Sequence, residues 1–408
     1  MKESDRISAL EAQVLELKIM VEKLIKSKSK KIDIDCNDVE KYLETLDKNS
    51  NYFVKAFGKF SQKKYDEAFI LFKKCLEREP NNDKAYFYIG CIWEIKENYE
   101  SAIANYIEAS NFAPKNPAYL NKLADLYYKN DENEKAIEKW EQVLELDSEY
   151  EINYLSKAIA EWAQDVPDYE QAIIDCNIFI NRNREDDIGS VVYSLKGDSE
   201  YCLERYEDAI KDLSKVLELD PDSAMDLHCR AKAYYQIDEY EKAIADWNKV
   251  LEIDSEYNIY YFEKAYAEYK IGEYLESIDD YTKYLLSNPD DAGAFNNRGL
   301  SKYKLENYVD SIEDYSRAIE LKPERAKFID NRAEAYYWND EYNKALEDWN
   351  RVLKIEPDYD VNYYYKAYSE KELKLYEDAI ISIDKYLSTS PDDEEALILK
   401  DIINSNLS

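Results

Sequence analysis

The sequence predicts an all-α fold built from tandem pairs of helices, and two observations support this prediction. A 34-residue unit, clearest from Ala224 to Tyr257, contains two consecutive stretches in which apolar residues recur three and four positions apart. This is the spacing of an amphipathic helix. The 408 residues also include only seven glycines and nine prolines, as expected for a chain with few strands and turns. Neither helix of a unit buries its apolar face alone, so neighbouring units must cover it.

The 34-residue unit has a fixed internal order. In its first half, Leu227, Ala231 and Tyr235 follow helical spacing, and after a short polar turn Ala243 and Trp247 do so in the second half. The alanine or serine of the second half recurs ten times, at Ala68, Ala102, Ala136, Ala172, Ala209, Ala243, Ser277, Ser311, Ala345 and Ala379. Seven of the nine intervals are 34 residues, so ten units follow one another in register.

Three further features repeat with the unit. The first half of each unit contains a small residue, alanine or glycine. It lies twelve positions before the recurring alanine or serine of the second half, except in the fourth unit, where an insertion lengthens the interval. An aromatic residue usually follows four positions after that alanine or serine, and in seven of ten units a proline follows twelve positions after it. Small residues let two helices approach closely, the aromatic ring fills the space between units, and proline ends the second helix.

This pattern resembles the tetratricopeptide repeat (TPR), whose 34-residue consensus combines a small residue, paired aromatic residues, alanine, a bulky residue and proline. The resemblance covers ten repeats over residues 49–393. It implies a TPR solenoid, a right-handed superhelix of helix-turn-helix repeats in which each repeat contacts only its neighbours. The consensus describes packing, so by itself it names no activity or partner.

The regions that flank the repeats form separate predicted segments. Residues 1–31 combine an amphipathic helix with a lysine-rich linker, residues 32–48 cap the first repeat, and residues 394–408 form a C-terminal capping helix. Apolar residues in the first segment alternate in steps of three and four, at Ile7, Leu10, Val14, Leu17, Val21 and Leu24. This heptad seam predicts a short coiled coil, as a parallel dimer or a larger bundle. The alternative is a helix that folds back onto the first repeat.

Two irregularities modify the array. Two additional residues fall in Gln164–Asp168 and three more in Asn181–Gly189, so we expect the chain to bend there or these loops to contact a partner. Repeats three, six and nine share a tryptophan in the second helix, at Trp140, Trp247 and Trp349. The array therefore also resembles three copies of a three-repeat block, for which recent duplication without functional meaning is the alternative explanation.

The charge and the residue types exclude several function classes. With 88 acidic and 54 basic residues, the formal net charge is −34, which repels nucleic acid and acidic membranes and favours basic partners. The chain has one histidine, His228, and it shows no glycine-rich phosphate loop, zinc-ligand spacing or nucleophile elbow. We therefore predict no enzyme activity, no cofactor and no metal site. The abundant carboxylates are expected to lie on solvent-facing helix surfaces.

One column of residues indicates a binding surface. The residue four positions after the small residue of each first helix is aromatic in eight of ten repeats. These eight residues, the aromatic column, are Phe60, Tyr128, Trp162, Tyr201, Tyr235, Tyr269, Tyr303 and Tyr337. In the TPR fold this position lines the concave groove, so the resemblance implies peptide binding there. The alternative is a structural role for these rings. The nearby Cys91, Asp125, Ile159 and Asp198 do not supply the lysine- and asparagine-lined clamp with which some TPR proteins hold chaperone tails.

These patterns predict a non-enzymatic scaffold that binds a protein or extended peptide in a concave groove, with basic and apolar residues in the partner. The alternative is a structural homo-oligomer assembled through residues 7–25 and the repeat ends, and an accessory subunit of an enzyme is a third possibility. Six scattered cysteines without C-x-x-C spacing, and a start without an apolar signal region, predict a cytoplasmic protein with reduced thiols.

Deletion of residues 1–31 tests the predicted coiled coil. If the heptad seam joins chains, the full-length protein is an oligomer and the deletion variant is a monomer, because the apolar seam is the interface that is removed. Light scattering of both proteins measures their masses. Masses that correspond to the same oligomeric state before and after the deletion would contradict the prediction.

Overall fold

The computed structural model describes residues 52–183, 189–253, 259–357 and 361–407, and within these ranges the chain is all-α and contains no strand. The predicted segments 1–31 and 32–48 lie outside the described residues. The helices fall into two compact units, of which the first ends at Pro221 and the second begins at Asp222. Among the described residues, no helix is both long and apolar enough to cross a membrane.

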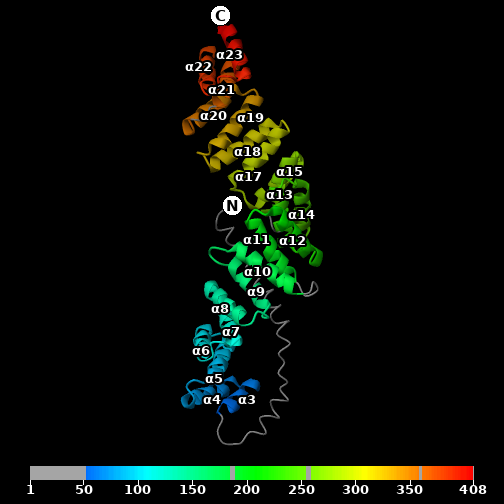
Figure 1. The fold of residues 1–408 in the computed structure, drawn as a ribbon. Coiled ribbons are helices and arrows are strands. Elements are labelled where there is room, and N and C mark those ends of the chain that lie inside the picture. The colour runs from blue at the N-terminus through cyan, green and yellow to red at the C-terminus, as the bar shows by residue number, and fades with distance from the viewer. Residues whose placement is uncertain (1–51, 184–188, 254–258, 358–360, 408) are drawn as a thin grey trace. The chain divides into compact units, whose positions relative to one another are not determined.

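The described part of the first unit, from Tyr52 to Pro221, contains five helix pairs, which Figure 1 labels in chain order. The helices are α3 (Tyr52–Ser61), α4 (Tyr65–Arg78), α5 (Asp83–Ile95), α6 (Tyr99–Phe112), α7 (Pro117–Lys129), α8 (Asn133–Leu146), α9 (Ile152–Trp162), α10 (Tyr169–Arg182), α11 (Ser190–Cys202) and α12 (Tyr206–Leu219). Within this unit, each first helix packs against its own second helix, and α4, α6, α8 and α10 each pack against the following first helix. This nearest-neighbour packing is the arrangement of a solenoid.

The second unit contains five more pairs and a final helix. The helices are α13 (Ala224–Gln236), α14 (Tyr240–Ile253), α15 (Ile259–Ile271), α16 (Tyr274–Ser287), α17 (Ala292–Lys304), α18 (Tyr308–Leu321), α19 (Ala326–Trp338), α20 (Tyr342–Ile355), α21 (Val361–Glu372), α22 (Tyr376–Leu387) and α23 (Glu394–Leu407). The ten pairs of the described residues correspond to the ten predicted repeats, which we number one to ten in chain order.

The turn inside nearly every repeat has the same hydrogen bonds. In repeat six, the Asp238 N–H donates to the Tyr235 carbonyl at 3.2 Å and the Glu239 N–H donates to the Tyr234 carbonyl at 3.0 Å. This is a Schellman motif, which requires a left-handed backbone at its central residue. Nine turns have such a residue, at Lys63, Glu97, Asp131, Glu204, Asp238, Gly272, Glu306, Asp340 and Lys374. Only repeat seven uses glycine there, so the other turns carry a modest backbone cost.

The close approach of the two helices explains the small residue in each repeat. At Gly299, an added Cβ would lie 2.7 Å from the Tyr315 ring, and at Gly90 it would lie 2.6 Å from the Tyr106 ring. The alanines or serines of the second helices are completely buried, as are the large rings packed near them, such as Trp247. The core is therefore a row of small-to-large contacts, repeated once in every helix pair.

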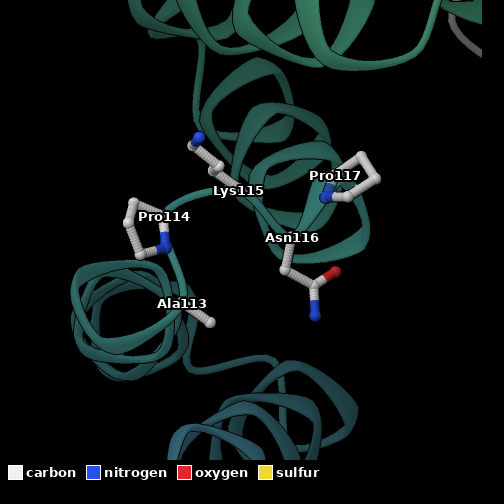
Figure 2. Close-up of a pocket in the computed structure, with 5 residues that line it drawn as sticks. All are labelled: Ala113, Pro114, Lys115, Asn116 and Pro117. Atoms are coloured by element: carbon white, nitrogen blue, oxygen red, sulfur yellow. The ribbon is translucent and has the colours of Figure 1, made fainter.

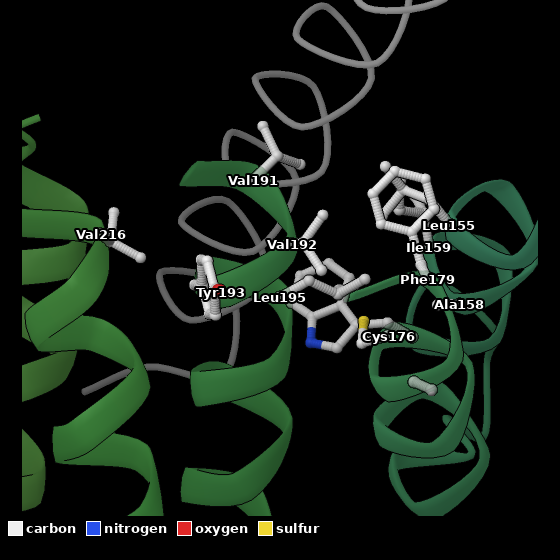
Figure 3. Close-up of a cluster of buried hydrophobic side chains, with 12 residues drawn as sticks. Leu155, Ala158, Ile159, Cys176, Phe179, Val191, Val192, Tyr193, Leu195 and Val216 are labelled. Carbon is white, nitrogen blue, oxygen red and sulfur yellow. The ribbon is translucent and has the colours of Figure 1, made fainter. Parts of the chain in front are cut away.

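Packing continues across both insertions of the first unit. The insertion in repeat four lies in the turn between α9 and α10, and the other lies between α10 and α11. Apolar side chains from α9 to α12 form one buried cluster (Figure 3) that includes Ile159, Phe179 and Val192. The additional residues are thus accommodated in connections, and the helix contacts are kept.

The final helix leaves part of its apolar surface uncovered. Three residues of α23 pack against the last helix pair, namely Ala396, Leu399 and Ile403. Three others are 43%, 59% and 44% exposed, namely Leu397, Ile398 and Ile402. The outer surface of α23 is consequently more apolar than expected for a helix that ends such an array.

Gly299→Val tests the small-to-large contact. The valine side chain would collide with the Tyr315 ring, and overpacking of this kind costs about 1–3 kcal/mol, so we expect a lower melting temperature by circular dichroism. Gly272→Asn is the matched control, because Gly272 has a φ of 86° and nothing within 4 Å of an added Cβ, and asparagine tolerates left-handed backbone. Equal melting temperatures of Gly299→Val and the unchanged protein would contradict this account.

Candidate functional site

The aromatic column occupies the last turn of the first helices. In the first unit it consists of Phe60, Tyr128, Trp162 and Tyr201, and in the second of Tyr235, Tyr269, Tyr303 and Tyr337. Trp162 is buried and the other seven side chains are half-buried. The rings therefore retain some accessible surface at equivalent positions of their helices, as a binding role requires, but much of each ring is already in contact with protein.

Most of these rings pack within their own repeat. Six of the eight contact the tyrosine that begins the second helix, five positions later, with ring centroids 5.3–5.7 Å apart. The Tyr235–Tyr240 pair is an example, at 5.3 Å and an interplanar angle of 67°. Such edge-to-face pairs contribute about 0.5–1.5 kcal/mol beyond area burial. A structural role for the column is thus visible in the contacts.

The same rings also reach the next repeat. Trp162 donates from Nε1 to Asp198 Oδ2 at 2.8 Å, and the Tyr337 and Tyr368 ring centroids are 6.2 Å apart. Asp198 and Tyr368 both directly follow the small residue of their first helix. The column therefore links successive first helices along one surface, and a ligand that touched it would touch the contacts between repeats.

Many carboxylates of the paired helices are buried, in contrast to the solvent-facing positions expected from their spacing. A basic residue directly before the small residue pairs with an aspartate of the second helix in repeats four to nine. Arginine pairs are bidentate: Arg230 Nε and Nη2 lie 2.8 and 2.7 Å from the two oxygens of Asp246, which is 7% exposed. The expectation that carboxylates lie on solvent-facing surfaces is wrong for this set, because each aspartate faces a cation on the paired helix.

Where the basic residue is lysine, a glutamate joins the pair. Lys264 Nζ lies 2.5 Å from Asp280 and 2.9 Å from Glu268, one turn along α15. Lys157 and Lys196 make corresponding contacts with a glutamate and an aspartate. Lysine is followed four positions later by glutamate in repeats four, five, seven and ten, whereas the arginine repeats have tyrosine or lysine at that position. The lysine ammonium group contacts two carboxylates, whereas Nε and Nη2 of each arginine both donate to the same carboxylate.

The lysine clusters contain more carboxylates than cations. Burial raises the pKa of Glu268 to about 7, and the neighbouring Asp280 raises it further while Lys264 lowers it. Burial also raises the pKa values of Glu161 and Glu200, with Asp175 and Asp212 adding to the respective effects. These glutamates therefore bind a proton in the folded protein at pH values where an exposed glutamate is ionised.

The histidine is part of the packing. His228 accepts a hydrogen bond from Trp247 Nε1 at its Nδ1, over 3.0 Å, and its ring packs against Tyr260. Burial lowers the pKa of His228 to about 3, with Lys232 contributing. The imidazole is consequently neutral at physiological pH and is held as an acceptor for a core tryptophan.

A shallow surface depression lies away from the aromatic column. It is formed by the loop between α6 and α7 (Figure 2), and its lining residues are Ala113, Pro114, Lys115, Asn116 and Pro117. The column lies at the C-terminal ends of the first helices, whereas this loop leads into the N-terminal end of one. The depression brings together two prolines and short or flexible side chains, and we assign it no function.

Comparison with known families agrees with this architecture. The model of the tetratricopeptide repeat protein 21 C-terminal ARM domain matches residues 22–163, and two tetratricopeptide repeat models match residues 195–259 and 292–325. The chain is a tetratricopeptide repeat protein. Its TPR-containing relative MJ1428 from Methanocaldococcus jannaschii is 28% identical over 166 residues, which cover 40% of this chain and 29% of the relative. The chain thus spans less than a third of that protein's length.

Solved TPR structures show lower similarity. A TPR protein from Parabacteroides merdae is 16% identical, with 62% of this chain and 98% of that chain covered and a TM-score of 0.44. YrrB, described as a TPR protein with an unusual peptide-binding site, is 22% identical, with 46% and 97% covered and a TM-score of 0.42.

Glu268→Gln tests the buried lysine clusters through pH. Because the folded-state pKa of Glu268 exceeds that of an unfolded glutamate, its ionisation destabilises the fold as pH rises from about 4.5 to about 7. Glutamine cannot ionise and so avoids this cost. We therefore expect the difference between the melting temperature of the variant and that of the unchanged protein to be more positive at pH 8 than at pH 5. The exposed Glu313→Gln is the control. A pH-independent difference for Glu268→Gln would contradict the assignment.

Proposed function

We propose that this TPR protein is a non-enzymatic interaction scaffold that binds an extended peptide along the first helices of its repeats. The observation that carries the proposal is the run of half-buried tyrosines in four successive repeats of the second unit, Tyr235, Tyr269, Tyr303 and Tyr337. Tyrosine offers a large apolar contact area and a polar tip at a low cost in rotamer entropy, which suits peptide recognition.

Charge defines the chemistry of the partner. The chain has a net charge of −34, and carboxylates such as Glu334 lie next to the tyrosines of the second unit. An acidic surface attracts basic segments, increases their association rate and disfavours nucleic acid. We therefore propose a peptide or protein segment in which lysine or arginine alternates with apolar anchors.

The residue types agree with a binding role in a reducing compartment. The single histidine is held in the core as an acceptor for Trp247. Among the described residues, no cysteine forms a disulfide, as is usual in the cytoplasm. We accordingly propose a cytoplasmic protein whose activity is to hold partners rather than to transform a substrate.

The double variant Tyr235→Ala/Tyr269→Ala tests the aromatic column. Peptides selected from a library of random ten-residue sequences against the unchanged protein provide the ligands, and we expect lysine or arginine between apolar anchors among them. If the tyrosines contact the peptide, the variant loses about 1–2 kcal/mol of binding free energy per side chain. Added salt should weaken binding further, mainly through slower association.

Melting temperature and affinity must be measured on the same double variant. A purely structural role predicts a lower melting temperature, because the contacts with Tyr240 and Tyr274 are lost, but unchanged affinity in the folded fraction. Intact affinity would remove these two tyrosines from the site. Selection of no peptide at all from the library would contradict the proposed function itself.

A further inference from the structure

The first helices of repeats eight, nine and ten bring two carboxylates and two tyrosines together. Asp330 and Glu334 lie one turn apart on α19, so both point to the same side of that helix. Tyr303 of α17 lies close enough to interact electrostatically with Glu334, and Tyr365 of α21 interacts in the same way with both carboxylates. The cluster therefore joins three successive first helices within the second unit.

The lysines near Asp330 and Glu334 neutralise the negative charge of these carboxylates only in part. Lys327 Nζ lies 3.2 Å from Asp330 Oδ2, but the lysine side chain is 57% exposed, and an exposed ion pair is weakly held. Burial raises the pKa of Glu334, with Asp330 adding to the effect, although Lys327 and Lys304 oppose it. Lys327 shows that an ammonium group fits against Asp330, and the opposing effects of Lys327 and Lys304 do not cancel the rise in the pKa of Glu334.

The second helix of repeat nine adds a buried donor, the indole N–H of Trp349. Trp140, Trp247 and Trp349 occupy equivalent positions in the second helices of repeats three, six and nine. Each packs against the aromatic-column residue of its own repeat, with ring centroids 5.9, 6.5 and 6.1 Å apart and interplanar angles of 51°, 52° and 50°. The three indole rings therefore pack in a similar way against their aromatic-column residues.

In repeats three and six the indole N–H has an acceptor on the first helix. Trp140 Nε1 donates to Asp125 Oδ1 at 3.2 Å, and Trp247 Nε1 donates to His228 Nδ1 at 3.0 Å. The residues of repeat nine that correspond to Asp125 and His228 are Glu334 and Asp330, respectively.

Neither of these two carboxylates satisfies the indole of repeat nine. Trp349 is completely buried, and its Nε1 has no hydrogen-bond partner among the described residues. Asp330 instead accepts a hydrogen bond from Lys327, and Glu334 interacts with Tyr303. A buried N–H without an acceptor is costly. An oxygen atom of a bound ligand that accepted a hydrogen bond from this N–H would remove that cost.

We propose that Asp330, Glu334 and Trp349 form a subsite for one basic residue of a bound peptide. The carboxylates accept the ammonium or guanidinium group, and the Trp349 N–H donates to a backbone carbonyl oxygen of the same segment. Tyr303 and Tyr365 present aromatic surface to the cation and its methylene chain. This inference rests on the proposed function, because it specifies which repeats recognise a basic residue.

Two tyrosine side chains pack against the indole ring of the subsite, and a peptide must displace them to reach the N–H. Tyr365 stacks on Trp349 with ring centroids 5.9 Å apart, and Tyr337 packs against the same indole. Both tyrosines are half-buried. A peptide carbonyl reaches the N–H by displacing side chains at the surface, while the helices stay in place, and the exposed Lys327 is exchanged for the lysine or arginine of the peptide.

The test uses three fluorescein-labelled ten-residue peptides that share leucine and phenylalanine anchors and carry lysine, norleucine or glutamate at the central position. Fluorescence anisotropy gives their affinities. We expect the lysine peptide to bind about tenfold more tightly than the norleucine peptide, and the glutamate peptide to bind most weakly. The lysine preference should fall when salt is raised from about 50 to about 500 mM, because screening weakens ion pairs.

Asp330→Asn/Glu334→Gln should reduce the lysine preference, measured as the ratio of the lysine-peptide affinity to the norleucine-peptide affinity, to about one. Glu313→Gln/Glu347→Gln is the matched control, since it removes two exposed carboxylates from equivalent positions of α18 and α20 and should keep the preference. Trp349→Phe, which keeps an aromatic ring but removes the N–H, should weaken the lysine and norleucine peptides equally. Melting curves confirm that each variant is folded.

A lysine preference that survives in Asp330→Asn/Glu334→Gln would overturn the carboxylate subsite. Unchanged affinities in Trp349→Phe would overturn the role of the indole N–H. Binding of the norleucine peptide by the unchanged protein with no lysine preference, or a preference insensitive to salt, contradicts this inference alone. Failure of the unchanged protein to bind any of the three peptides would contradict the proposed groove function as well.

Discussion

The structure depends on the close contact between the two helices of each repeat. A glycine or alanine on the first helix leaves room for a large side chain from the second helix. At Gly299, for example, an added Cβ would lie only 2.7 Å from the Tyr315 ring. Because each repeat buries its apolar surface only against itself and its neighbours, the contact must recur in every repeat for the array to be continuous. The fully buried alanines and rings of the second helices reflect this constraint.

A second layer of interactions surrounds this contact. Buried ion pairs such as Arg298–Asp314 join the same two helices close to the small residue. An ion pair of this kind adds little net stability compared with apolar packing, but loss of one partner costs about 3–5 kcal/mol because a buried charge remains. The pairs therefore help to fix which residues of the two helices face each other. The lysine repeats add a glutamate, such as Glu268, and so make part of this layer sensitive to pH.

The fold was predictable from the sequence because the same weak signals recur ten times in register. The buried ion pairs were not predicted, since a single aspartate such as Asp246 has the helical spacing of a surface residue. The signal that would have found them is the correlation across repeats between lysine or arginine, aspartate and glutamate. The left-handed turn residues were equally hidden, because only Gly272 has the residue type typical of that backbone. The predicted N-terminal segments lie outside the described residues.

The residues of the aromatic column lie on successive first helices, but the sequence alone could not distinguish binding from packing. The contacts indicate why the two roles are not exclusive. Tyr337 packs against Tyr342 in its own repeat and Tyr368 in the next, so its ring belongs to the junction between repeats. A peptide that covers such a ring would stabilise the junction, because a ligand that binds only the packed arrangement favours it. Peptide binding and the stability of the array would then be thermodynamically linked.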